Sequence, residues 1–297
     1  MTRNKAAGLL LLAAAVWGLA FLFQKSAMRH IGPLTFIAAR GVVATLALAP
    51  LAWREAQLSS PRPPGLLRWS LAGGLLFFLA AALQQSGLQT ASVTNSGFLT
   101  ALYVVITPLI AWGMTRQAPR RFVWFGVALS ALGTWLLGGA SFASFSIGDV
   151  QVAASSVFWA GHVVLTGRAA RFGRPLAFTL IGFVLVAVLG CAGAASLEAP
   201  SAAGIGRAAL DIAYVGVLSS AFAFLLLIVA LRHLPAAEGA IIASTETLFA
   251  ASAAYLVLGE QLSLLGWLGA ALILAASILV QVAPALARGG RGAALAG

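Results

Sequence analysis

Ten stretches of mostly apolar residues, each long enough to cross a lipid bilayer, recur along the chain. A membrane-spanning helix needs about 20 predominantly apolar residues. Of the 297 residues, 61% are hydrophobic and only 8% are charged, and this composition argues against a β-barrel, whose strands alternate in polarity. The sequence therefore predicts an all-α integral membrane protein with ten transmembrane helices. The predicted spans are 6–24, 34–53, 66–88, 92–114, 122–140, 149–167, 175–196, 211–231, 236–257 and 263–283.

The net charge of +11 comes mainly from basic residues in the short turns between the spans. This distribution favours a topology signal over nucleic-acid binding, because cytoplasmic loops of membrane proteins are enriched in Lys and Arg. With a cytoplasmic N-terminus, fourteen of the 18 basic residues face the cytoplasm, three face outward, and Arg40 lies within a span. The positive-inside rule thus predicts that both termini are cytoplasmic.

The chain also repeats itself. Residues 17–36 align without gaps on residues 159–178, at an offset of 142, and later matches follow at an offset of 143. Each half then holds five spans, and because five is odd, the second half is predicted to be inverted relative to the first. The predicted repeats are 1–145 and 146–297. Inverted repeats are typical of secondary transporters, with a binding site near the midplane between the halves, although repeats also arise in scaffolds. The identities include Trp17/Trp159, Pro33/Pro175, Phe36/Phe178, Trp124/Trp267 and Gly126/Gly269.

Several segments resemble the EamA-type ten-span members of the drug/metabolite transporter superfamily. They are WGLAFLFQK in the first span, PLTFIAARG in the second, TNSGFLTALYVVITPL in the fourth, and ASTETLFAASAAYLVLGEQLSLLGWLGAALIL across the last two. The resemblance covers nearly the whole chain. It implies two inverted five-helix repeats around a central cavity, lined by the first four helices of each half and supported by the fifth. The nearest functional analogy is with the YddG-type bacterial exporters of amino acids, aromatic ones in particular.

Polar groups within spans usually face the bundle interior or a water-filled cavity. At about 1.5 Å of rise per residue, Glu246, His162 and Tyr103 lie near the midplane of their spans. Glu246 is interpreted as a proton-coupling group, a partner for a substrate ammonium, a structural pair with Arg40, or a neutral acid bonded to another helix. Arg40 could bind a substrate carboxylate through two parallel hydrogen bonds. It is equally suited to a structural pair with Glu246 or to snorkelling toward the membrane interface. His162 fits a proton shuttle or a structural hydrogen bond.

Aromatic and uncharged polar residues complete the candidate site. Trp17, Trp159 and Tyr103 predict an aromatic lining that stacks on substrates, with helix packing as the alternative. Gln84, Asn95 and Thr100 lie toward the outer half of the third and fourth spans, where they line a vestibule or join helices by hydrogen bonds. Pro108 is predicted to act as a gate hinge or to form a static kink. The substrate-binding candidates are Trp17, Gln84, Asn95, Thr100, Tyr103, Trp159, His162 and Glu246.

No nucleotide-binding loop, HExxH motif, nucleophile elbow or metal-ligand cluster occurs in the sequence, and Cys191 is the single cysteine. No enzyme activity, cofactor or metal is therefore expected. We expect a secondary transporter of the bacterial inner membrane that exports small organic solutes, chiefly aromatic or neutral amino acids or related metabolites, by alternating access. The alternatives are a facilitator, a carrier of other metabolites or cationic drugs, and a scaffold that transports nothing. The expected partners are a small-molecule substrate and the lipid bilayer, without nucleic acid; the oligomeric state stays open, and a monomer is compatible with the sequence.

Overall fold

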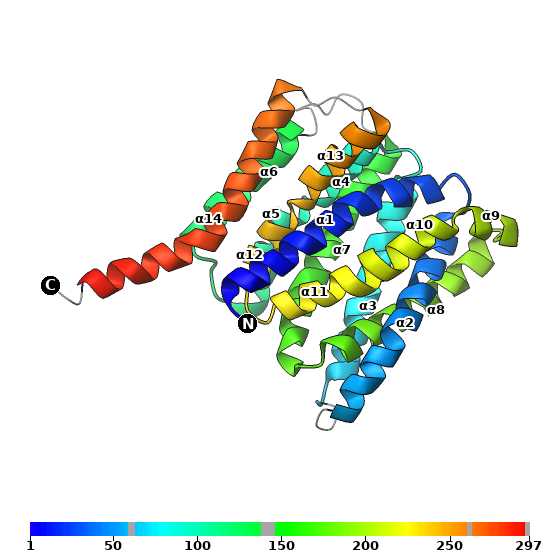
Figure 1. Ribbon diagram of the computed structural model, residues 1–297, viewed down its shortest axis with the longest axis horizontal. Helices are drawn as coiled ribbons and strands as arrows, with labels where there is room; N and C mark the ends of the chain where they lie inside the picture. Colours follow the sequence, from blue (N-terminus) through cyan, green and yellow to red (C-terminus); the bar gives the residue numbers. More distant parts are fainter. Residues whose placement is uncertain (59–62, 138–145, 260–262, 295–297) are drawn as a thin grey trace.

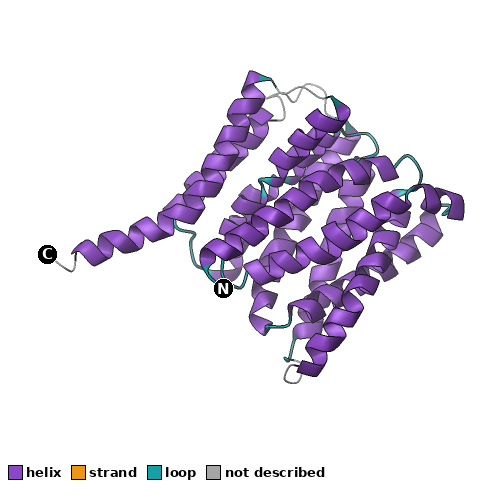
Figure 2. Ribbon diagram, in the orientation of Figure 1, coloured by secondary structure: helices purple, strands orange, loops and turns teal. Residues whose placement is uncertain are grey.

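The structure, a computed structural model, describes residues 1–58, 63–137, 146–259 and 263–294. Every regular element in these residues is a helix (Figure 2). The first half comprises α1 (Arg3–Ala27), α2 (Pro33–Leu58), α3 (Leu66–Gly87), α4 (Val93–Thr100), α5 (Tyr103–Thr115) and α6 (Arg121–Leu137). The second comprises α7 (Ile147–Ala169), η1 (Ala170–Phe172), α8 (Pro175–Leu197), α9 (Ala202–Arg207), α10 (Ala209–Ala213), η2 (Tyr214–Phe222), α11 (Ala223–Ala230), α12 (Ala236–Ala243), α13 (Glu246–Leu258) and α14 (Leu264–Ala294).

Eight helices or collinear helix groups in the described residues are long and apolar enough to cross a membrane. The two shorter apolar segments, Arg121–Leu136 and Leu264–Val280, correspond to the predicted fifth and tenth spans. The second helix continues to Leu58 instead of ending at the predicted residue 53. No proline falls between residues 53 and 58, so the backbone hydrogen bonds of the helix continue past the apolar run.

Helices from the two halves pack against each other throughout the bundle (Figure 1). At one edge α6 lies beside α14, and at the opposite edge α2 lies beside α8. The α6–α14 pair approaches closely, because a Cβ at Gly133 would meet the carbonyl oxygen of Gly269 at 2.6 Å. Small residues allow helix backbones to come together in this way within a membrane. Each pair thus joins one helix of the first half to one of the second.

The α2–α8 pair is antiparallel and is fastened at both ends by glutamate side chains. Glu55, near the C-terminus of α2, accepts hydrogen bonds from the backbone N–H groups of Leu176 and Ala177 in the first turn of α8. Glu198, directly after α8, accepts hydrogen bonds from Leu34 N–H and Thr35 N–H in the first turn of α2. These N–H groups have no partner within their own helix, and carboxylates are favoured at helix N-termini.

The fourth and ninth predicted spans are each broken in the middle. Helix α4 ends at Thr100 and α5 begins at Tyr103, while α12 ends at Ala243 and α13 begins at Glu246. The two breaks are separated by 143 residues in the sequence, which is the offset between the halves. Irregular backbone at membrane depth is tolerated where it is buried in protein or lines a cavity. A cavity is therefore expected beside the two breaks.

Hydroxyl groups satisfy the backbone at the second break. The Ser244, Thr245 and Thr247 hydroxyls each donate to the carbonyl oxygen three residues earlier, at 2.8, 2.7 and 2.9 Å. Such bonds compete with regular helical ones. Proline is not the shared cause of the breaks: Pro108 lies inside α5, and Ala251 occupies its position in the second half. The role of Pro108 as a gate hinge stays a prediction, and the interruption of its span lies earlier, at residues 101–102.

The centre of the bundle is an aromatic cluster around Phe77 of α3. Its ring centroid lies 4.9 Å from that of Phe224, 4.9 Å from that of Phe183 and 5.1 Å from that of Trp159, all in edge-to-face arrangements. Edge-to-face pairs are worth about 0.5–1.5 kcal/mol each beyond the burial of their area. Since α3 belongs to the first half and the three partners to the second, the cluster fixes the two halves against each other.

Candidate functional site

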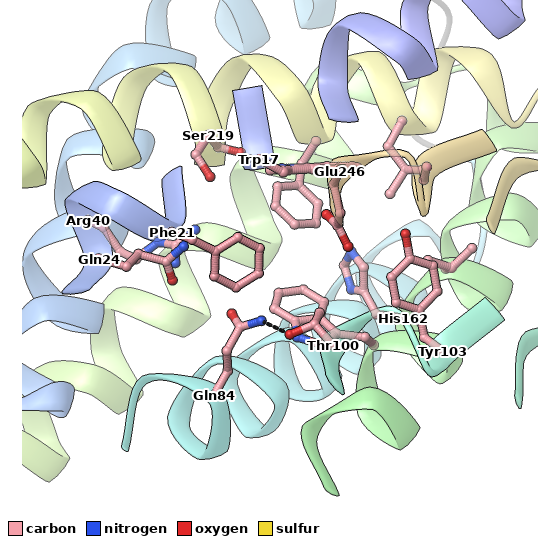
Figure 3. A pocket seen from close by; sticks show the side chains of 15 residues that line it. Trp17, Phe21, Gln24, Arg40, Gln84, Thr100, Tyr103, His162, Ser219 and Glu246 are labelled. Carbon is pink, nitrogen blue, oxygen red and sulfur yellow. Dashed lines mark hydrogen bonds between the residues drawn. The ribbon is translucent and has the colours of Figure 1, made fainter. Parts of the chain in front are cut away.

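A cavity lies between the two halves; its empty space, which includes open solvent, amounts to about 560 Å³. Its walls come from α1, α2, α3, α4, α5, α7, η2, α11, α12 and α13, so that α6, α8 and α14 do not contribute. The lining residues are Trp17, Phe21, Gln24, Arg40, Gln84, Thr100, Tyr103, Trp159, His162, Val163, Ser219, Phe224, Leu227, Ala243 and Glu246 (Figure 3).

Ten of these fifteen residues form pairs related by the sequence offset between the halves. Trp17/Trp159 and Phe21/Val163 are separated by 142 residues, and Gln84/Leu227, Thr100/Ala243 and Tyr103/Glu246 by 143. The cavity therefore uses equivalent positions of both halves. The chemistry is not symmetric, because an amide, a hydroxyl and a phenol from the first half face leucine, alanine and glutamate from the second.

Most of the sequence-predicted site residues meet at this cavity. Trp17, Gln84, Thr100, Tyr103, Trp159, His162 and Glu246 all line it, and so does Arg40. Asn95 does not: it lies in the first turn of α4, beyond the cavity, where its amide donates to Asp149 Oδ1 at 3.2 Å. Of the eight helices that the resemblance implied as lining, only the predicted seventh, α8, contributes no residue to the wall.

Arg40 brings a positive charge to the cavity and is 2% exposed. Its Nε donates to Ser220 Oγ at 2.9 Å, and its guanidinium carbon lies 5.3 Å from the centroid of the Phe77 ring. Within the described part of the chain, the ion pair found is between Arg3 and Glu238. Arg40 and Glu246 therefore line one cavity without forming an ion pair. Their side chains lie toward opposite ends of it in Figure 3.

Glu246 is the first residue of α13 and is 5% exposed. Tyr103, from the equivalent position in the first half, lines the same end of the cavity as Glu246. The carboxyl atom Oε1 is buried and has no hydrogen-bond partner among the described residues. This end of the cavity thus offers an acceptor to a donor group of a bound molecule.

His162 has partners on both ring nitrogens. Its Nδ1 lies 3.0 Å from the carbonyl oxygen of Gly73, and its Nε2 lies 3.4 Å from the Thr166 hydroxyl. Both contacts satisfy the ring within the bundle, which matches the structural hydrogen bond weighed in the sequence. His162 also lines the cavity, and its contact with a substrate stays a prediction.

The two equivalent tryptophans are held differently. Trp17 donates from Nε1 to the carbonyl oxygen of Ser219 at 3.1 Å and tilts against Phe224 at a centroid distance of 4.9 Å. Trp159 stacks on Phe224 at 5.9 Å, and its Nε1 is buried without a hydrogen-bond partner in the described chain. Phe224 therefore lies in contact with both indole rings, and together the three rings form an aromatic wall.

Several lining residues were not singled out from the sequence. Gln24 lies in the last turn of α1, where the sequence alone favours a position at the membrane interface. Its side chain is instead buried, with 5% exposure, and its Oε1 has no hydrogen-bond partner in the described residues. Ser219 lines the cavity from η2, a π-helix of nine residues, and the neighbouring Ser220 holds Arg40. Such π-helical turns are often found at functional sites. The remaining additions are Phe21, Val163, Phe224, Leu227 and Ala243.

No group of three or more His, Cys, Asp or Glu residues in the described chain is arranged to hold a metal ion. The polar groups of the cavity are instead spread around it: Arg40, Gln24, Gln84 with Thr100, whose hydroxyl accepts a hydrogen bond from the Gln84 amide at 2.7 Å, and Tyr103 beside Glu246. A mainly apolar pocket with a few fixed polar groups is typical of sites that bind small organic molecules reversibly.

The chain is similar to known transporters over almost its full length. It is 26% identical over 281 residues to an uncharacterized transporter of Archaeoglobus fulgidus, covering 92% of this chain and 84% of that protein. It is 25% identical over 287 residues to the uncharacterized transporter YwfM of Bacillus subtilis, covering 92% and 93%. One solved structure, described only as the crystal structure of a protein, has the same fold with a TM-score of 0.75 at 20% identity, covering 94% of this chain and 98% of that one.

The family comparison covers both halves of the chain. The sequence profile of the EamA-like transporter family matches the chain twice, at residues 4–139 and at residues 146–282. The two matches together account for most of the chain, and the resemblance seen in the sequence is confirmed. The protein is therefore a multi-pass membrane protein that belongs to the EamA-like transporter family, within the drug/metabolite transporter superfamily.

Proposed function

We propose that this protein is a secondary transporter that exports amino acids with aromatic or neutral side chains, or related metabolites, by alternating access. The observation that carries the proposal is the cavity between the halves, built from equivalent positions of both and lined by Trp17, Trp159 and Phe224. Flat rings stack on aromatic and apolar substrates. Arg40 toward one end of the cavity and Glu246 toward the other add polar contacts to these apolar walls.

The alternating-access part of the proposal rests on inverted repeats. Reciprocal capping by Glu55 and Glu198 at the antiparallel α2–α8 pair is what two inverted halves would produce. The equivalent breaks in the fourth and ninth spans support the same relation. When two inverted halves exchange conformations, one central site becomes open to each side of the membrane in turn.

The charge of the cavity favours amino acids over phosphorylated solutes. Arg40 is the one Lys or Arg among the lining residues of the described chain. A phosphate group usually requires several cationic or backbone N–H donors. A single guanidinium suits a carboxylate better, since one bidentate pair satisfies it.

The orientation and location also belong to the proposal. Fourteen basic residues against three favour cytoplasmic termini in a bacterial inner membrane. In that orientation the turns at residues 116–120 and 170–174 face the cytoplasm, and the turns at 28–32 and 88–92 face outward. Export then carries substrate from the cytoplasmic side of the membrane to the outer side.

Counterflow in proteoliposomes tests the function. Vesicles loaded with unlabelled amino acid are diluted into radiolabelled threonine, methionine, phenylalanine or tryptophan, with and without a pH gradient. We expect label to accumulate transiently for at least one of the four, and not in empty liposomes. A pH gradient that changes accumulation would indicate proton coupling, whereas equal rates would indicate a facilitator. No accumulation of any of the four contradicts the amino-acid assignment.

Matched tryptophan variants test the cavity itself. Trp159→Ala removes a ring that stacks in the cavity, and we expect the apparent affinity for phenylalanine and tryptophan to fall about tenfold. Trp267→Ala is the control, because Trp267 is 63% exposed on α14 and does not line the cavity. Equal losses in the two variants would assign the effect to folding and not to substrate contact.

A further inference from the structure

The guanidinium of Arg40 is fixed in place but is not neutralised by the protein. Burial at 2% exposure removes it from water, and Ser220 Oγ takes only the Nε–H. Of the five N–H donors of an arginine, this is the one that has a hydrogen bond in the described chain. The Phe77 ring supports the planar group from one side. The two terminal nitrogens therefore have no hydrogen-bond partner among the described residues. Because Arg40 lines the cavity, they are available to a bound molecule.

A buried charge without a counter-charge is unfavourable, and leaving one partner of a buried pair alone is strongly destabilising. Charged residues within membrane spans accordingly pair with one another, with backbone carbonyls or with a bound substrate. No carboxylate of the described chain forms an ion pair with Arg40. The partner that fits is an anionic group supplied by the ligand. A carboxylate suits the pair of terminal nitrogens, which donate two parallel hydrogen bonds.

Gln24 adds an acceptor at the same end of the cavity. It lies in the last turn of α1, and Arg40 lies in the first third of α2, so the turn at 28–32 brings the two helix ends together. Figure 3 shows both side chains at the end of the cavity away from Glu246, Tyr103 and His162. Gln24 Oε1 is buried without a partner in the described chain. Its backbone carbonyl is already occupied by Gln85 Nε2 at 3.1 Å, which holds this residue in position.

We propose that Arg40 and Gln24 form the head-group site for an α-amino acid. The terminal nitrogens of Arg40 donate to the substrate carboxylate, and the substrate ammonium donates to Gln24 Oε1. The side chain of the substrate then lies along Trp17, Phe21 and Phe224, with its tip toward Glu246. This inference rests on the proposed transport of amino acids and names the residues that recognise the part common to all of them.

The assignment explains why a charged group is retained among apolar walls. Arg40 has no basic counterpart in the second half, where Gly182 stands at the offset of 142. A structural contact between the halves would be expected to use both equivalent positions. A head-group site, in contrast, is needed only once in a cavity that binds one substrate molecule, so a single arginine fits it.

Binding to the purified, detergent-solubilised protein tests the assignment through ratios of affinity. The probes are L-tryptophan and L-methionine, the amide of each, which lacks the carboxylate, and indole-3-propionate, which lacks the ammonium. We expect the wild-type protein to bind each amino acid about 10- to 100-fold more tightly than its amide, as for a charge-assisted bidentate pair. In Arg40→Gln this preference falls to within about threefold, because the amino acid binds more weakly while the amide does not. In Gln24→Leu the preference for tryptophan over indole-3-propionate falls, and the carboxylate preference stays.

Two controls keep the outcome unambiguous. Arg29→Gln removes the same charge from an exposed position near the outer end of α1, and its affinity ratios should equal those of the wild type. Glu246→Gln tests the competing acceptor at the other end of the cavity, and the assignment predicts that it lowers the preference for ammonium less than Gln24→Leu does. If Arg40→Gln does not yield monodisperse protein, the test uses Gln24→Leu and Arg40→Lys. Arg40→Lys keeps the positive charge but cannot form the two parallel hydrogen bonds of a guanidinium.

The results that overturn the assignment are distinct from those that overturn the function. If the wild type binds the amino acids and Arg40→Gln weakens amino acid and amide equally, Arg40 is a packing residue and the head-group site is wrong. If Glu246→Gln and not Gln24→Leu removes the preference for ammonium, the ammonium lies at the far end. If the wild type binds neither tryptophan nor methionine, both the head-group site and the proposed transport of these amino acids are overturned.

Discussion

Glu55 and Glu198 cap each other's helices: each lies at the C-terminal end of one helix of the α2–α8 pair and accepts two backbone hydrogen bonds from the first turn of the other. The two residues are separated by 143 positions, the offset between the halves. The Thr35 hydroxyl adds a third bond to Glu198 at 2.6 Å, whereas its counterpart Ala177 has no hydroxyl. The relation is thus reciprocal in geometry and slightly unequal in strength.

Removing either cap should destabilise the protein. We expect Glu55→Ala and Glu198→Ala each to cost about 1–3 kcal/mol, since hydrogen bonds to a charged group are lost and backbone donors are left without a partner. The loss at Glu198 should be the larger, because of the extra hydroxyl bond. Thermal unfolding of the purified protein measures both.

The amide variants are the controls for these caps. Glu55→Gln and Glu198→Gln each keep one acceptor oxygen and should show smaller losses than the alanine variants. A melting temperature that is unchanged in both alanine variants would mean that the caps contribute nothing to stability.

Two glycines of α1 make a second comparison. A Cβ at Gly18 would lie 2.5 Å from Phe249 Cβ and 2.6 Å from the carbonyl oxygen of Glu246, whereas a Cβ at Gly8 would meet nothing within 4 Å. Gly18→Ala should therefore push α1 away from α13 beside the break, at a cost of about 1–3 kcal/mol, and reduce counterflow. Gly8→Ala should be neutral or slightly stabilising, because alanine favours the helix more. Equal behaviour of the two variants would contradict the close approach at Gly18.

Single cysteines test the orientation in the membrane. In a Cys191→Ser background, Gln89→Cys and Gln117→Cys place thiols at exposed positions of two turns at opposite ends of the bundle. An impermeant maleimide applied to intact spheroplasts should label Gln89→Cys, and it should label Gln117→Cys only after permeabilisation. The reverse pattern would contradict the topology predicted from the basic residues.

Much of the cavity could be predicted because depth within a span follows from residue counting. Tyr103 and Glu246 were placed near the midplane in this way, Trp17 and Trp159 were singled out as equivalent aromatic residues of the two halves, and the structure brings all four to one cavity. Depth fixes only one coordinate, however. The direction in which a side chain points around its helix depends on how the helices pack, and the sequence does not contain this directly.

The residues that were missed illustrate that limit. Gln24 lies close to Lys25, and the two resemble an interfacial end of a span, yet Lys25 Nζ donates to the carbonyl oxygens of Leu88 and Ala91 while Gln24 lines the cavity. Ser220 was hidden because the π-helix changes the faces that residues of η2 present. Asn95 lies in the first turn of α4 and donates to Asp149 of α7, which matches the alternative of joining helices by a hydrogen bond.

The helix breaks had a signal that was not used. The run Ser244, Thr245, Glu246 and Thr247 is unusually polar for the centre of a span, and hydroxyl side chains compete with helical hydrogen bonds. Pro108, which was predicted to act as a hinge or to form a kink, lies inside α5 and not at the break. Glu55 and Glu198 likewise show the repeat offset in the sequence, but both lie outside the predicted spans.

Access to the cavity from both sides of the membrane is the central requirement of the mechanism. Ala243 lines the cavity at the second break and is 1% exposed, so Ala243→Cys in a Cys191→Ser background reports on solvent access at the midplane. The measurement is labelling by an impermeant maleimide in right-side-out and in inside-out vesicles, with Cys191 alone, on the outer face of α8, as the control. Alternating access predicts labelling in both vesicle types, with tryptophan or methionine reducing the rate in each. Labelling from one side only, or a rate that neither amino acid changes, would contradict it.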